Sequence, residues 1–154
     1  MVEKIIRPVA DTAAEKGNIK TVKTILVIEE NESIRANLSE WLELDKYKIV
    51  AASNGLSGLK LANEFIPDLI ICNVMMSGMN GYEVLFALIK TPLTSKIPFI
   101  FSTCKSDKKD KVKAICLGAD DYLVKPYELE TLSVMAANWI RSGSRRPKIS
   151  QLIM

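Results

Sequence analysis

Polar side chains suited to binding chemistry follow directly after four short apolar runs of this 154-residue chain. They are Glu29 and Glu30 after residues 23–28, Asn73 after 69–72, Ser102 and Thr103 after 98–101, and Lys125 after 122–124. Carboxylates beside a lysine suit a divalent cation next to an anion such as phosphate. Taken singly, each residue is better explained by a solvated loop or a turn. Together, at four strand ends, they predict one polar pocket.

The elements that must position these side chains form an alternating pattern of strands and helices. Runs that are apolar on both faces, such as 69–72, are typical of central strands in a parallel sheet. Helical spacing follows, as in Ile34, Leu38 and Leu42 after the candidate cap Asn31. We expect strands at 23–28, 47–52, 69–72, 98–101 and 122–124, and helices near 34–42, 56–65, 82–89, 105–117 and 129–140. The pattern predicts an α/β domain whose functional crevice lies outside the carboxyl ends of the strands.

Composition excludes several classes of protein. The chain has no histidine, which rules out histidine-based acid–base or triad chemistry. Three scattered cysteines, Cys72, Cys104 and Cys116, have no CxxC spacing, so we expect them to be reduced and mostly buried rather than zinc ligands. No apolar run approaches the ~20 residues of a membrane helix, and residues 1–22 do not resemble a secretory signal. We therefore expect a cytoplasmic protein that is not an enzyme.

The charge distribution suggests three segments. Residues 24–140 hold 12 Lys/Arg against 15 Asp/Glu, whereas 141–154 hold four Lys/Arg and no acid. A mildly acidic central part with basic ends argues against a nucleic-acid-binding core. We expect an N-terminal extension at 1–22, a domain at 23–141, and a basic tail or truncated linker at 142–154.

Four motifs of this chain resemble the receiver domains of two-component response regulators. They are ILVIEEN, PDLIICNVMMSGMNGYEVL, IPFIFSTCKSD and GADDYLVKPYELETL, and the resemblance runs from about residue 23 to residue 141. It implies a flavodoxin-like doubly wound (βα)5 sandwich with a parallel sheet in the order 2-1-3-4-5.

The resemblance also implies site roles by position. Asn73 stands where the family has the aspartate that accepts a phosphoryl group from a sensor kinase. The other positions are the acidic pair that helps to hold Mg²⁺ (Glu29 and Glu30), the backbone carbonyl that ligates it (Met75), the phosphoryl-binding side chains (Thr103 and Lys125) and the aromatic switch (Tyr122). Two smaller departures are Ser77, where the family usually has proline, and Cys104 after Thr103.

Asn73 is the departure with the largest chemical consequence. A neutral carboxamide is a poor nucleophile, so we do not expect an acyl phosphate to form at residue 73. Two glutamates and an amide replace three carboxylates, so we expect no firm cofactor and at most weak Mg²⁺ binding. Lys125 is then expected to pair with Glu29 or Glu30, or to donate to the Asn73 oxygen.

The sequence predicts a signalling module that works through protein partners, either a sensor kinase or an output protein, without membrane or nucleic acid. A homodimer through the fourth helix, fifth strand and last helix is one interpretation of its charges; a solvated face is the other. In the homodimer, Lys108, Lys109, Lys111 and Lys113 would face Asp120, Asp121, Glu128 and Glu130 of a second copy. Two alternative functions stay open. One is a conventional phosphorylated regulator in which Asn73 was introduced. The other is a flavodoxin-like cofactor-binding protein or enzyme, which the lack of a Gly-rich loop after the first strand disfavours.

Overall fold

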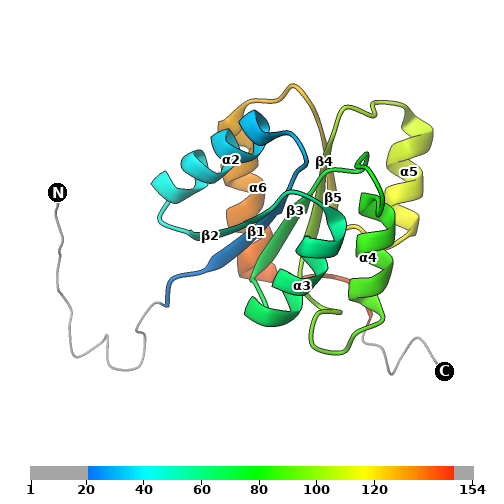
Figure 1. The fold of residues 1–154 in the computed structure, drawn as a ribbon, viewed down its shortest axis with the longest axis horizontal. Helices are drawn as coiled ribbons and strands as arrows, with labels where there is room; N and C mark the ends of the chain where they lie inside the picture. The colour runs from blue at the N-terminus through cyan, green and yellow to red at the C-terminus, as the bar shows by residue number, and fades with distance from the viewer. Residues whose placement is uncertain (1–20, 148–154) are drawn as a thin grey trace, which may run out of the picture.

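The computed structural model describes residues 21–147 and contains a five-stranded parallel sheet. The strands are β1 (Thr24–Ile28), β2 (Lys48–Ala52), β3 (Leu69–Cys72), β4 (Phe99–Thr103) and β5 (Asp121–Val124). They lie in the order β2-β1-β3-β4-β5, as predicted for a flavodoxin-like sandwich (Figure 1). The fold class is therefore confirmed.

Helices cover both faces of this sheet (Figure 1). They are α2 (Glu32–Leu44), α3 (Gly55–Phe65), α4 (Gly81–Ile89), α5 (Lys108–Cys116) and α6 (Leu129–Ser142). Alternate residues of β1 point to opposite faces, as the strand period requires. Ile25 packs with α2 and α6 in one core, and Leu26 packs with α3, α4 and α5 in the other. Both faces of β1 are buried, which explains its continuous apolar sequence.

Asparagine caps set the start of three helices near the functional edge of the sheet. The side chain of Asn31 accepts a hydrogen bond from Ile34 N at 2.9 Å, which confirms the predicted cap of α2. Asn54 and Asn80 cap α3 and α4 in the same way, and Asn80 forms a capping box with Glu83. Each cap satisfies a free backbone donor at the helix N-terminus, so these helices begin at defined residues.

A polar link joins α2 and α6 on one face of the sheet. Trp41 Nε1 donates to Ser133 Oγ at 2.7 Å, and Ser133 Oγ donates to Asp45 Oδ2 at 2.6 Å.

Among residues 21–147, no helix is long and apolar enough to cross a membrane.

The prediction that the cysteines are mostly buried was wrong for two of the three. Cys72 lies inside the sheet, but Cys104 and Cys116 are exposed. Cys104 follows the end of β4, and Cys116 ends a helix that buries only Ala114. Helix α5 lies with most of its surface toward solvent, so its apolar residues other than Ala114 are not core residues.

Candidate functional site

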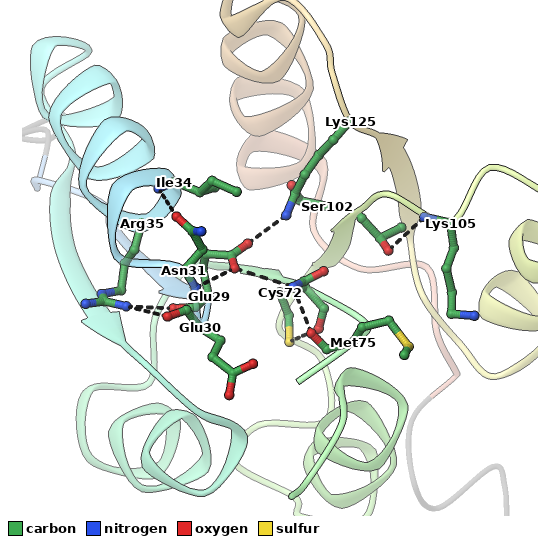
Figure 2. Close-up of polar contacts among 12 residues, drawn as sticks. Glu29, Glu30, Asn31, Ile34, Arg35, Cys72, Met75, Ser102, Lys105 and Lys125 are labelled. Atoms are coloured by element: carbon green, nitrogen blue, oxygen red, sulfur yellow. Dashed lines mark hydrogen bonds and ion pairs between the residues drawn. The ribbon is translucent and has the colours of Figure 1, made fainter. Parts of the chain in front are cut away.

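The polar residues after the strands meet at the carboxyl edge of the sheet, as Figure 2 shows. The register brings their strand ends together, because Ile28 of β1 pairs with both Ala52 and Cys72. Glu29 and Asn73 directly follow two of these paired positions. Parallel strands thus deliver side chains that lie 44 residues apart in sequence to one site.

A buried ion pair occupies the centre of the site. Lys125 Nζ donates to Glu29 Oε1 at 2.8 Å, and the side chains are only 13% and 3% exposed (Figure 2). Glu29 Oε2 accepts a hydrogen bond from Asn31 N at 2.9 Å. Of the partners expected for Lys125, the structure has Glu29. Since both charges are largely desolvated, each needs the other as its counterion.

Asn73 uses its amide nitrogen as a donor toward two acceptors. Nδ2 donates to the Met75 carbonyl at 2.9 Å and to Glu29 Oε2 at 3.4 Å. A carboxylate has no hydrogen to offer in either place. An aspartate in this arrangement would set its negative charge beside Glu29 and the Met75 oxygen. The local geometry therefore suits an amide at residue 73.

The Glu30 carboxylate binds the backbone of the loop after β3 instead of binding Asn73. Its carboxylate accepts a hydrogen bond from Ser77 N at 3.2 Å. The Arg35 guanidinium holds the chain at this position by donating to the carbonyls of Glu29 at 2.9 Å and Glu30 at 3.4 Å (Figure 2). A proline at residue 77 would have no N–H for Glu30. The serine noted as a departure in the sequence thus supplies a specific contact, which the residue type alone did not reveal.

The site residues do not fit Mg²⁺ in this arrangement. Hard cations bind oxygen ligands. Glu29 is paired with Lys125, and the Met75 carbonyl already accepts from Asn73. Across residues 21–147 there is no group of three or more acidic, cysteine or histidine side chains that could hold a metal ion.

Thr103 and Tyr122 lie beside the pocket, and both side chains form a hydrogen bond with the backbone of Lys105. Lys105 N donates to Thr103 Oγ1 at 3.2 Å, and Tyr122 OH donates to the Lys105 carbonyl at 2.8 Å. Thr103 is fully buried and Tyr122 is 5% exposed. Burial raises the pKa of Tyr122 to about 12, with smaller contributions from nearby Tyr82 and two aspartates. The tyrosine is held inward with its hydroxyl satisfied.

Ser102 and Tyr127 mark the other side of the pocket. Ser102 Oγ forms a 2.8 Å hydrogen bond with the hydroxyl of Tyr127, a residue the sequence did not single out. A groove of about 320 Å³ lies here, between α2 and the start of α6. Lys125 contributes to both the groove and the pocket. The lining residues are Ile34, Asn37, Leu38, Lys125, Pro126, Tyr127 and Leu129.

Comparison with known proteins identifies the family. The family model of the response regulator receiver domain matches residues 25–137. The chain belongs to that family. The match begins at the second residue of β1, takes in the other four strands and ends within α6.

The chain is similar in sequence to curated response regulators and in fold to solved receiver domains of other proteins. PilH of Pseudomonas aeruginosa is 36% identical over 108 residues, which cover 70% of this chain and 89% of PilH. The transcriptional regulatory protein AfsQ1 of Streptomyces coelicolor is 35% identical over 122 residues, 79% of this chain and 53% of AfsQ1. The receiver domain of a signal transduction histidine kinase from Syntrophus aciditrophicus matches with a TM-score of 0.74 and 30% identity, covering 83% of this chain and 97% of that chain. The chain spans about half the length of the first curated relatives it matches.

Proposed function

We propose that this receiver domain is a non-enzymatic signalling module of a two-component system that works without phosphorylation at residue 73. The observation that carries the proposal is the hydrogen bond from Asn73 Nδ2 to the Met75 carbonyl, next to the Glu29–Lys125 ion pair. An amide supplies no anionic oxygen to attack phosphorus.

The pocket supports this proposal because its charges are satisfied within the chain. A phosphoryl group at residue 73 would compete with Glu29 for Lys125, and would leave the 3% exposed Glu29 carboxylate without its counterion. Mg²⁺ would have to displace the Asn73 amide from the Met75 carbonyl. The internal contacts thus replace those that a phosphoryl group and a metal would make.

Signalling then takes place by binding a protein partner, and α5 offers an exposed surface for it. The helix and the residue after it expose Val112, Ile115 and Leu117, at 51%, 47% and 41%. Exposed lysines surround them, and the sequence 105–117 carries five lysines against two aspartates. Exposed apolar residues within a charged rim are typical of protein interfaces.

For one such contact we propose a homodimer through α5, β5 and α6. Fewer acidic side chains are available to pair with the lysines of a second copy than the sequence suggested. Asp120 is bound to Arg146, and Asp121 accepts from Trp139 Nε1 at 2.8 Å. Glu128 and Glu130 are exposed and stay free to face the lysines of a second copy. Light scattering after gel filtration tests this. Lys111→Glu should convert the dimer to a monomer. The control Lys60→Glu lies on α3, outside the proposed α5–β5–α6 interface, and should leave the dimer intact. A monomer at all concentrations contradicts the dimer.

Phosphoryl transfer is tested by incubating the intact chain with acetyl phosphate and Mg²⁺ and measuring its mass. We expect no phosphorylated species, because residue 73 has no carboxylate. The matched variant Asn73→Asp restores the nucleophile in the same scaffold. Phosphate found on the unaltered chain at residue 73 would overturn the proposal, as would a natural gene that encodes aspartate there.

A further inference from the structure

The sequence placed Arg146 in a basic tail, but the structure buries its side chain in the domain. Arg146 is 8% exposed, whereas the neighbouring Arg145 is exposed. Gly143, with φ of 76°, ends α6 and turns the chain. A buried arginine needs several acceptors to offset its desolvation.

Arg146 receives those acceptors from two loops at the end of the sheet opposite the pocket. Nε donates to the Ser95 carbonyl at 3.0 Å, and Nη2 donates to the Ile97 carbonyl. Both carbonyls lie just before β4. Nη1 donates to the Gly118 carbonyl at 3.0 Å, directly after α5. One guanidinium group therefore joins the segment before β4 to the end of α5.

Asp120, just before β5, completes this cluster. Its Oδ2 is 2.8 Å from Arg146 Nη1, and the two side chains are 2% and 7% exposed. Its Oδ1 accepts from Ser144 Oγ at 2.9 Å and from Arg145 N at 3.1 Å. Oδ2 also accepts from Phe99 N at 2.9 Å, at the start of β4. The carboxylate thus binds the chain after α6 at both of its oxygens.

We infer that residues 143–147 form a clasp, held by Arg146 and Asp120, that couples the end of α5 to the segment that follows α6. Helix α5 buries only Ala114, so few core contacts hold it in place. A partner that shifts α5 moves the Gly118 carbonyl, one of the four groups that bind Arg146. A shift of α5 therefore loosens the hold on residues 143–147. The inference rests on the proposed function for the partner surface on α5, but the clasp itself does not involve Asn73, so either can fail without the other.

Hydrogen exchange measured by mass spectrometry on the full chain tests the coupling from the side of the clasp. Arg146→Gln should speed amide exchange about tenfold both in 143–147 and in 114–119, with exchange in α2 unchanged. Arg145→Gln is the matched control: it keeps the backbone bond to Asp120, loses only a contact with the Trp139 ring, and should change neither segment. Arg146→Lys, which keeps the charge, should give a smaller effect if Gln proves too destabilising.

The reverse experiment changes Gly118, just after α5. A Cβ on Gly118 would lie 3.2 Å from Arg146 Cδ and 2.8 Å from Ile89 Cδ1, and its φ of 111° strains any other residue. Gly118→Ala should therefore speed exchange in 143–147, since energetic coupling is reciprocal. Faster exchange confined to the mutated segment in both variants would overturn the inference. An equal increase in all segments, α2 included, would also overturn it, because it would mean global destabilisation.

Discussion

At residue 73, an amide in place of a carboxylate reverses the hydrogen-bonding character of one side chain. Asn73 Nδ2 gives a hydrogen to the Met75 carbonyl, where a carboxylate would need a metal ion to neutralise both oxygens. The neighbouring Glu29 and Lys125 then satisfy each other. A single atom exchanged for another thus changes which partners the whole pocket needs.

The Glu29–Lys125 pair gives the first prediction. Glu29→Gln should lower the free energy of unfolding by about 3 kcal/mol, because it leaves a mostly buried lysine without its counterion. Urea denaturation measures the loss. The double variant Glu29→Gln/Lys125→Met should lose less than the sum of the single variants. Glu40→Gln, on the exposed face of α2, is the control and should change little. Additive losses would show that the ion pair is not coupled.

Tyr122 gives a prediction for pH. Its pKa is about 12 in the folded chain against 10.0 for a free phenol, so folding favours the neutral form. The stability that this shift contributes is present below pH 10 and is lost as the pH rises to about 12. Phenolate absorbance during alkaline titration should show a late component that disappears in Tyr122→Phe. A titration curve left unchanged by that substitution would contradict the assignment.

At the scale of elements, the loop between β3 and α4 carries the pocket geometry. Asn80 caps α4, Gly81 N donates to the Val74 carbonyl at 2.8 Å, and Glu30 holds Ser77 N. These contacts hold the Met75 carbonyl where the Asn73 amide reaches it. The loop is thus positioned by backbone bonds on both sides of Met75.

Gly81 tests this loop. A Cβ there would overlap the backbone oxygen of Asn73 and lie 2.9 Å from Phe101 Cε1 and 3.0 Å from Val74 Cα. Gly81→Ala should cost about 3 kcal/mol of stability in thermal or urea unfolding, since backbone must move. Gly78→Ala is the matched control. Its Cβ meets nothing within 4 Å, so only the positive φ of 72° should count, at about 1 kcal/mol. Equal losses would mean that packing at Gly81 is unimportant.

At the scale of the whole molecule, the two ends of the sheet have separate tasks. The carboxyl end holds the satisfied pocket, and the opposite end holds the Arg146 clasp. Helix α5 lies between these ends, close to Lys105 and Tyr122 at one end and to Gly118 at the other. A partner bound to α5 can therefore affect both ends.

Global stability should not respond to Mg²⁺ if the pocket is already satisfied. A ligand raises the melting temperature only when it binds the folded chain, and about 10 mM Mg²⁺ should leave it unchanged within about 1 °C. Asn73→Asp should melt at a higher temperature with Mg²⁺ than without it, because residue 73 then offers Mg²⁺ an anionic oxygen beside Glu29. Differential scanning fluorimetry measures both. Stabilisation of the unaltered chain by Mg²⁺, but not by the same ionic strength of NaCl, would contradict the absence of a metal site.

The sequence by itself determined the sheet and the identity of the pocket residues. Buried strands such as 69–72 are apolar on both faces, and helices repeat apolar residues at a different period, so the alternation of strands and helices and the α/β class could be predicted. The strand order was implied by the resemblance to receiver domains. Asn73 could also be interpreted from sequence, because the chemistry of an amide does not depend on its surroundings.

Only the tertiary structure decided which partners the polar groups take. Lys125 had three candidate partners, and the distance of 2.8 Å to Glu29 selects one. Neither the Ser77–Glu30 bond nor the burial of Arg146 has a sequence signal, since each joins segments far apart in the chain. Residue type limits which bonds a side chain can make, whereas folding determines which acceptor lies within reach, and a basic segment that looks like a tail can therefore be part of the core.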